Sequence, residues 1–340
     1  MRNAPISLAR PVWQRELAEA ITRPEELLEA LGLPIEWLAG AKAASRVFDL
    51  RVPRGFVARM RHGDANDPLL RQVLPLGEEL HAAEGFVADP LDEAAARSAP
   101  GLLQKYHGRA LLITTEACAV HCRYCFRREF PYAEQVDPGG SRWSAALQAI
   151  ASDPGIEEVI LSGGDPLSLS DARLTQLTAA LGHMAHVRRL RIHTRQPIVL
   201  PSRVDAGLRA WLGGIRMPVV IVLHANHPNE IDSEVRAACT ALRSTGATLL
   251  NQSVLLRGVN DDVGTLERLS ARLADAGVMP YYLHLMDRVH GTAHFEVPES
   301  RARELVRALT ARLSGYLVPR LVREVPGADS KVPIPLAPAC

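Results

Sequence analysis

Three cysteines lie within eight residues of one another. Cys118, Cys122 and Cys125 stand at C-x3-C-x2-C spacing, directly after the apolar run 110–113, which predicts a β-strand. Three thiolates on one tight loop can hold three irons of a four-iron cluster and leave the fourth iron without a protein ligand. A small molecule could bind that open iron and receive an electron. The pattern therefore predicts a [4Fe-4S] cluster with one open position.

Zinc is the main alternative ligand for these cysteines. A structural zinc site normally takes four protein ligands, commonly as two C-x2-C-like pairs, whereas Cys239 and Cys340 are isolated. A disulfide is disfavoured by the odd number of cysteines and the tight spacing. The cluster is the favoured interpretation, and zinc or no metal remain the alternatives. With an aromatic residue before its last cysteine, the loop resembles the radical S-adenosylmethionine (SAM) superfamily, whose motif is C-x3-C-x-aromatic-C.

Lysine is rare in this chain, because only Lys42, Lys105 and Lys331 occur among 39 basic residues. Lysine can form a Schiff base and arginine cannot. Lys331 follows the turn-forming run 326–330, so it is the candidate for holding pyridoxal phosphate (PLP); a solvated lysine is the alternative. Lys105, Tyr106 and Arg109 precede the first strand and could anchor the PLP phosphate, or they could be an ordinary basic cluster at a helix end.

From about residue 109, apolar β-branched runs alternate with helical patterns at roughly 30-residue intervals, the size of a βα unit. The expected strands are 110–115, 158–161, 189–194, 219–224, 248–255 and 280–285. The expected helices between and after them are 171–181, 203–212, 230–245, 263–276 and 299–313. The sequence therefore predicts an α/β fold in which a parallel sheet curves into a partial (β/α)6 barrel.

Three regions are expected along the chain. Residues 1–100 form a helical N-terminal region, in which no catalytic motif is found and whose simplest role is a packing layer. Residues 101–315 form the barrel core. Residues 316–340 form a Pro-rich, irregular C-terminal segment that contains a candidate final strand at 317–324 and the candidate PLP lysine.

Polar residues recur where the predicted strands end, and in such folds the chemistry lies at the C-terminal ends of the strands. Glycines after the second strand let the backbone approach a ligand closely, although a Gly-Gly pair can be only a turn. Arg195 follows the third strand, and the paired N–H donors of its guanidinium group suit a carboxylate. The residues that could contact SAM are Gly163, Gly164, Asp165, Arg195, His224 and Gln252.

Residues of both positive and negative charge could bind a substrate. Arg127 directly follows the last cysteine of the motif and could pair with a substrate carboxylate or offset the charge of the cluster. Asp287 and Glu324 could receive an ammonium group. Ordinary surface carboxylates are the alternative for these two acids.

Long segments resemble the lysine 2,3-aminomutase family, and most closely the bacterial branch that makes β-lysine for modifying elongation factor P. The resemblance covers almost the whole chain and is carried by 67–73, 101–107, 118–132, 162–167, 249–256, 280–284 and 314–319. It implies a radical SAM, PLP-dependent isomerase that converts L-lysine to β-lysine. It also implies that Cys118, Cys122 and Cys125 bind the cluster and that Lys331 binds PLP.

The resemblance assigns the substrate contacts by position. Arg127 matches the arginine that holds the α-carboxylate of lysine, and Asp287 matches an acid that receives the distal ammonium. Glu324 falls where clostridial enzymes carry a second aspartate, and His224 and Gln252 match SAM contacts. The run before Lys331 departs from the clostridial glycine run, and a C-terminal zinc-binding cysteine cluster is not expected.

Other activities remain open on the sequence alone. The same apparatus could serve an aminomutase that acts on another amino acid. A radical SAM enzyme without PLP is a second alternative, and a non-enzymatic iron–sulfur regulator is a third.

The composition is that of an ordinary globular protein, with 47% hydrophobic residues, 23% charged residues and a net charge of +1. This charge gives no case for binding nucleic acid, and no apolar run of 18 residues predicts a membrane span. Clustered free cysteines favour a reducing compartment, so a cytoplasmic location is expected. The expected partners are L-lysine, an electron donor, a functionally linked elongation factor P ligase and, in a homo-oligomer, further copies of the chain.

Overall fold

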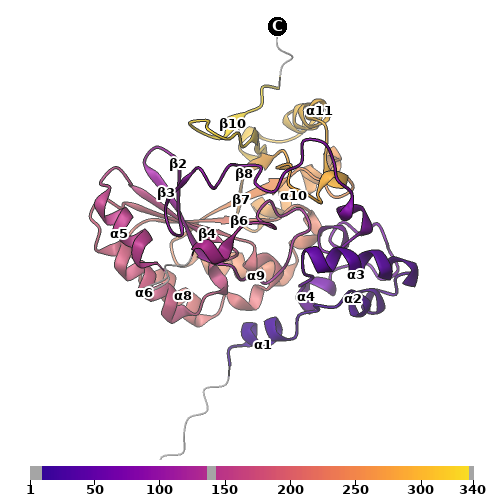
Figure 1. Ribbon diagram of the computed structural model, residues 1–340, viewed down its shortest axis with the longest axis horizontal. Coiled ribbons are helices and arrows are strands. Elements are labelled where there is room, and N and C mark those ends of the chain that lie inside the picture. The colour runs from indigo at the N-terminus through magenta and orange to yellow at the C-terminus, as the bar shows by residue number, and fades with distance from the viewer. Residues whose placement is uncertain (1–9, 136–142, 337–340) are drawn as a thin grey trace, which may run out of the picture.

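A curved ten-stranded sheet is the centre of the fold (Figure 1). The computed structural model describes residues 10–135 and 143–336. Seven strands run parallel in the middle of the sheet: β3 (Arg109–Thr115), β4 (Glu158–Gly163), β5 (Arg189–Thr194), β6 (Val219–Leu223), β7 (Thr248–Val254), β8 (Met279–His284) and β9 (Arg320–Arg323). The first six are the strands predicted from the sequence. All six residues of β4 are buried, as expected for a parallel strand that is covered on both faces.

A helix follows each of the first six parallel strands, which confirms the predicted (β/α)6 arrangement. These helices are α5 (Ser144–Ser152), α6 (Asp171–Gly182), α8 (Ala206–Gly213), α9 (Ser233–Arg243), α10 (Val263–Asp275) and α11 (Glu299–Thr310). Four of them begin with a side chain that accepts a hydrogen bond from a first-turn N–H, namely Ser170, Asp205, Asp232 and Asp262. The longest, α10, has 13 residues, and no helix in the described ranges is long and apolar enough to cross a membrane.

Short antiparallel strands flank the parallel sheet on both sides. β1 (Arg97–Ala99) and β2 (Leu102–Tyr106) form a hairpin beside β3, and β10 (Val332–Pro333) pairs with β9. Lys105 near one edge lies 3.3 Å from Glu324 near the other, measured from Nζ to Oε1. The sheet therefore curls until its two sides meet across the interior. The sequence analysis did not predict β1 or β2. The alternative interpretation of Lys105, Tyr106 and Arg109 as a basic cluster at a helix end is wrong, because Lys105 and Tyr106 lie in a strand.

The N-terminal region packs against the cysteine loop. Its helices are α1 (Val12–Ala18), α2 (Pro24–Leu31), α3 (Leu38–Val47) and α4 (Arg54–Val57), and they lie together at one side of the sheet (Figure 1). One hydrophobic cluster joins Leu27 and Phe56 of this region to Ala119 and Val120 of the loop. The short α7 (Gln196–Val199) adds Val199 to the same cluster. The region therefore contributes directly to the surroundings of the three cysteines.

Candidate active site

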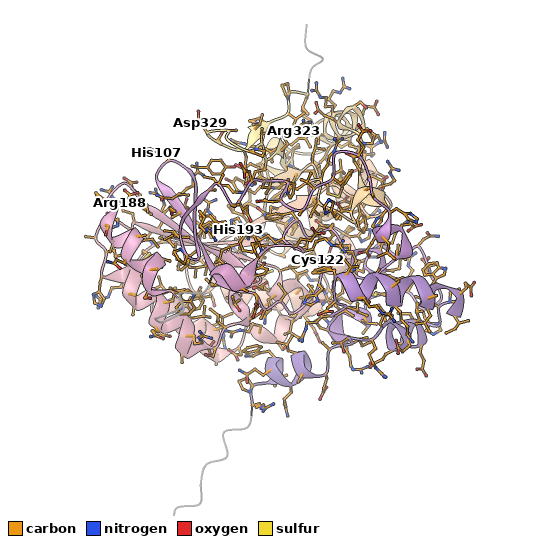
Figure 2. All side chains as sticks on the ribbon, in the orientation of Figure 1. His107, Cys122, Arg188, His193, Arg323 and Asp329 are labelled. Atoms are coloured by element: carbon orange, nitrogen blue, oxygen red, sulfur yellow. The ribbon has the colours of Figure 1, made fainter. Side chains whose placement is uncertain are left out.

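A cavity with a volume of about 510 Å³ lies inside the curve of the sheet. Figure 2 labels Cys122 and His193 near the middle of the molecule, and both line this cavity. All sixteen residues predicted to form the site also line it: Lys105, Tyr106, Arg109, Cys118, Cys122, Cys125, Arg127, Gly163, Gly164, Asp165, Arg195, His224, Gln252, Asp287, Glu324 and Lys331. The structure thus brings them together, while the role of each remains a prediction.

The cysteine loop begins where β3 ends. The Thr115 hydroxyl accepts a hydrogen bond from the amide of Ala117, and the Cys122 carbonyl accepts one from the amide of Cys125. Burial, the charge of Asp165 and the two other thiols raise the pKa of Cys118, and burial and Cys122 raise that of Cys125 to about 11. Buried thiolates therefore need a nearby cation, which iron would supply.

The spacing of these thiols suits a cluster better than a single ion. Cys118, Cys122 and Cys125 are free thiols that line one cavity. A four-iron cluster spreads its cysteine ligands over separate irons. The donor set therefore fits a cluster with three protein ligands.

The glycine pair after β4 packs against the cysteine loop. Gly163 has a positive φ of 121°, and a Cβ there would lie 2.6 Å from the Thr115 carbonyl oxygen. A Cβ on Gly164 would lie 2.5 Å from the Ala117 carbonyl oxygen. Both positions require glycine for this close backbone contact, so the contact itself explains the pair. Approach to a ligand stays a prediction.

Asp165 ties the ends of β4 and β5 together. Its buried carboxylate accepts hydrogen bonds from the Thr194 hydroxyl at 2.7 and 2.9 Å and from the amides of Leu167, Arg195 and Gln196. Burial raises its pKa, and these hydrogen bonds act in the opposite direction. Since its oxygens are occupied by protein donors, Asp165 shapes the backbone beside the cysteine loop.

Arg195 faces a carboxylate of this same chain. Its Nη2 donates to Glu230 at 2.9 Å and to the Gln72 side-chain oxygen at 2.7 Å. Its Nη1 lies 2.7 Å from the sulfur of Cys122 and 2.6 Å from the Tyr124 hydroxyl. The predicted carboxylate contact is thus made inside the protein, and Arg195 joins the N-terminal region to the cysteine loop.

Five alternating charges line one wall of the cavity, from the C-terminal segment to the cysteine loop. Lys331 Nζ lies 2.6 Å from Glu324, and Lys105 Nζ lies 3.3 Å from Glu324 and 3.1 Å from Glu93. Glu93 then accepts two hydrogen bonds from Arg127, at 2.7 and 2.8 Å. The two lysines lower the pKa of Glu324 to about 2 despite its burial. Glu324 is therefore ionised and already paired with two cations.

Asp287 has a different electrostatic environment. No cation lies within ion-pair distance of its carboxylate in the part of the chain that the structure describes. Burial and the charge of Glu324 raise its pKa to about 7, although Lys331 and Lys105 act in the opposite direction. An acid with this environment gains strongly from an incoming cation.

Three histidines place Nε2 atoms at this cavity that have no hydrogen-bond partner within the described part of the chain, namely His193, His224 and His284. Burial lowers the pKa of His224 to about 3 and lowers those of the other two well below the ordinary value. The neutral rings can each donate or accept a hydrogen bond at Nε2. Buried polar atoms without protein partners are suited to a polar ligand or to water.

Comparison with known proteins gives the family. Residues 107–190, which include all three loop cysteines, match the model of a 4Fe-4S single cluster domain. An L-lysine 2,3-aminomutase of Escherichia coli (strain K12) is 49% identical over 96% of both chains. That of Haemophilus influenzae is 46% identical over 94% of both chains, and that of Clostridium subterminale is 36% identical over 95% of this chain and 77% of its own. The chain belongs to the L-lysine 2,3-aminomutase family. The members of this family are isomerases, so the predicted enzyme class is confirmed.

A solved structure is also similar. A radical SAM methyltransferase from Sphaerobacter thermophilus aligns with 65% of this chain and 68% of its own, with a TM-score of 0.44 and 18% identity.

The sequence analysis missed several buried polar residues of this aminomutase-family chain. Gln72 and Glu79 come from the region interpreted as a packing layer, and that interpretation was incomplete. Glu79 accepts hydrogen bonds from Arg123 at 2.6 and 2.9 Å and from Arg128 at 2.7 Å. Single acids in a loop-rich stretch have no diagnostic spacing, so only their burial distinguishes them. Glu93, His193 and His284 were not assigned either, although the two histidines lie at predicted strand ends.

Proposed function

We propose that the protein converts L-lysine to β-lysine by moving the amino group from the α- to the β-carbon, with a [4Fe-4S] cluster, SAM and PLP as cofactors. One observation carries the proposal. Lys331 and the three loop cysteines line the same cavity, in a chain that belongs to the lysine 2,3-aminomutase family. An amine that can hold PLP therefore lies in one chamber with thiols that can hold a cluster.

The polar groups of the cavity fit these cofactors. When bound, the cluster supplies an electron, SAM a carbon-centred radical, and PLP a carrier for the migrating amine. Cys118, Cys122 and Cys125 would hold the cluster, and Lys331 would hold PLP through its amine. Lys105, Tyr106 and Arg109 present two cations and a phenol to the cavity, which suits a phosphate. Gly163, Gly164, Asp165, Arg195, His224 and Gln252 are the proposed SAM contacts.

The substrate would be oriented by its two charged ends. Arg127 lies beside the cysteine loop and would pair with the α-carboxylate of lysine. Asp287 lies near Lys331 and Glu324 and would receive the distal ammonium. Holding both ends would present one β-hydrogen to the radical.

An anaerobic turnover assay tests the proposal. The iron-reconstituted protein receives PLP, SAM, a strong reductant and L-lysine, and β-lysine and 5′-deoxyadenosine are followed by mass spectrometry. We expect β-lysine with only trace deoxyadenosine, because the radical is recycled. Deoxyadenosine without β-lysine would make lysine the wrong substrate and favour an aminomutase for another amino acid. Deoxyadenosine formation that is independent of PLP would favour a radical SAM enzyme without PLP, and failure to cleave SAM would favour an iron–sulfur regulator.

Lysine binding should depend on pH through Asp287. Its pKa of about 7 means that the carboxylate is protonated, and cannot pair with an ammonium, at lower pH. The side-chain ammonium of lysine stays charged throughout this range. We therefore expect the KM for lysine to rise by about tenfold per pH unit as the pH falls below 7. Asp287→Asn should raise the KM at pH 8 and flatten the profile. A KM that does not change between pH 6 and 8 in the wild-type enzyme would contradict the assignment.

The link to elongation factor P is a further part of the proposal. It is supported by the resemblance of the long segments named above to the branch that serves this factor. The product β-lysine would be passed to a ligase that modifies elongation factor P. Incubating the reaction products with such a ligase and elongation factor P, and measuring the mass of the factor, tests the link separately from turnover.

A further inference from the structure

Glu93 connects two parts of the site that are assigned to different ligands. Its carboxylate accepts from Arg127 Nε at 2.7 Å and from Nη2 at 2.8 Å, and it lies 3.1 Å from Lys105 Nζ. Arg127 is the proposed partner of the substrate carboxylate, and Lys105 is a proposed partner of the PLP phosphate. The Glu93 side chain is 2% exposed and lines the cavity. One buried acid therefore holds both cations.

The backbone before Glu93 is in an unusual conformation. Asp92 has a φ of 49°, and among the described residues it is the only non-glycine residue with a positive φ. Such conformations are rare for L-residues and occur often at functional sites, where the surrounding structure enforces them. The Asp89 side chain closes the turn around Asp92, because it accepts a hydrogen bond from the amide of Ala94 at 3.1 Å. The strained turn is thus the element that presents Glu93 to the cavity.

The loop that carries Glu93 is anchored by the residues that precede it. Phe86 and Leu91 are buried, and Val87 forms a parallel bridge with Val289. This bridge lies two residues beyond Asp287, the proposed ammonium partner. The loop is therefore fixed to the far end of the substrate site as well as to Arg127, so the position of Glu93 is set by tertiary contacts.

The remaining contacts of Arg127 show what Glu93 leaves available. Glu93 uses Nε and Nη2, which form one edge of the guanidinium group. Nη1 donates to the Ser162 hydroxyl at 3.0 Å and lies 3.5 Å from the Gly163 carbonyl oxygen. The bidentate contact fixes the plane of the guanidinium, and that plane decides where Nη1 can meet a substrate.

We propose that Glu93 is a positioning residue that fixes Arg127 and Lys105 relative to each other, and so couples the carboxylate end of the site to the phosphate end. The inference rests on the proposed function, because it uses the ligands assigned there. In the opposite arrangement, Glu93 would compete with the substrate carboxylate for Arg127, and the substrate would have to displace it. The two arrangements predict opposite changes in lysine affinity when Glu93 loses its charge.

The test compares Glu93→Gln with the wild-type enzyme in two measurements. The first titrates PLP into the apoprotein, traps the bound cofactor with borohydride and measures the modified fraction by mass spectrometry. The second measures KM and kcat for lysine in the fully loaded enzyme. We expect the PLP concentration for half-loading and the KM to rise about tenfold or more each, with kcat changed by less than about threefold. Glu93→Asp keeps the charge and should recover part of both losses, which a role in folding alone would not produce.

Controls separate the possible failures. Glu84→Gln removes an exposed acid from the same loop and should change neither measurement. An unchanged KM and half-loading concentration in Glu93→Gln, or a lower KM, would overturn the inference, and the lower KM would identify a competitor. A wild-type enzyme that neither takes up PLP nor turns over lysine would instead reject the proposed function.

A second pair of variants covers the case in which Glu93→Gln does not fold. The double variant Glu93→Gln/Arg127→Gln removes both members of the buried ion pair, which is tolerated better than removing one. It is compared with Arg127→Gln in the PLP titration. Half-loading should need more PLP in the double variant, because Lys105 has lost its contact with Glu93 and keeps only Glu324. Equal values for the two variants would overturn the inference.

Discussion

We expect Lys331→Arg to abolish covalent attachment of PLP and to lower β-lysine formation to background. Arginine keeps a cation opposite Glu324, whose carboxylate lies 2.6 Å from the Lys331 amine, but it cannot form an imine. Because the ion pair with Glu324 is retained, a loss of PLP attachment would show that the Lys331 amine itself is needed. The measurement is borohydride reduction of the PLP-treated protein, followed by peptide mapping with mass spectrometry. SAM binding should be unchanged.

The other two lysines provide the control and the contrary outcome. Lys42 lies on α3, where it pairs with Glu25 at 3.6 Å and is 49% exposed, so Lys42→Arg should leave the PLP adduct intact. Lys105 lines the cavity and shares Glu324 with Lys331. A reduced adduct on Lys105 in both the wild-type and the Lys331→Arg protein would move the attachment point to that residue.

Cys122→Ala should remove the iron–sulfur cluster and all cleavage of SAM. Three cysteines line the cavity, and a cluster held by only two of them loses a protein ligand at one iron. The variant also removes the sulfur that lies 2.7 Å from Arg195 Nη1. The arginine keeps its contacts with Glu230, Gln72 and Tyr124. We expect iron and acid-labile sulfide to fall to background after anaerobic reconstitution, and deoxyadenosine to become undetectable.

Cys239→Ala is the matched control for this experiment. Cys239 is a fully buried thiol of α9 in the core between the helices and the sheet, outside the residues that line the cavity. Its replacement should leave the iron content and SAM cleavage unchanged. If Cys122→Ala retained a full complement of iron and cleaved SAM at the wild-type rate, the cluster assignment of this loop would be lost.

Local patterns account for the parts of this protein that could be predicted. The spacing of Cys118, Cys122 and Cys125 is set within one loop, so its chemistry can be inferred without knowing the fold. The alternation of apolar strands and amphipathic helices reports burial directly, which is why all six predicted strands appear in the structure. Parallel strands bring their C-terminal ends to one edge, and this rule places Arg195 and His224 at the cavity before any coordinates exist.

Contacts between distant segments could not be predicted in the same way. Glu93 meets Arg127 across 34 positions, Gln72 meets Arg195 across 123, and Lys105 meets Glu324 across 219. Each of these contacts depends on how loops and sheet edges close around the cavity, which no periodicity in the chain encodes. The β1–β2 hairpin is also short and irregular, with a register shift between its strands, so its pattern resembled that of a loop.

The amino-acid sequence by itself determined the cysteine loop and the order of the barrel units and singled out Lys331 as the candidate for PLP, because each depends on residue type and short-range spacing. Only the tertiary structure decided how the charges are shared. It pairs Glu324 with two lysines, leaves Asp287 without a cation among the described residues and gives Arg127 the carboxylate of Glu93. The physical reason is that the ionisation and partners of a buried group are set by desolvation and by charges a few ångströms away, and folding brings those charges from remote parts of the chain.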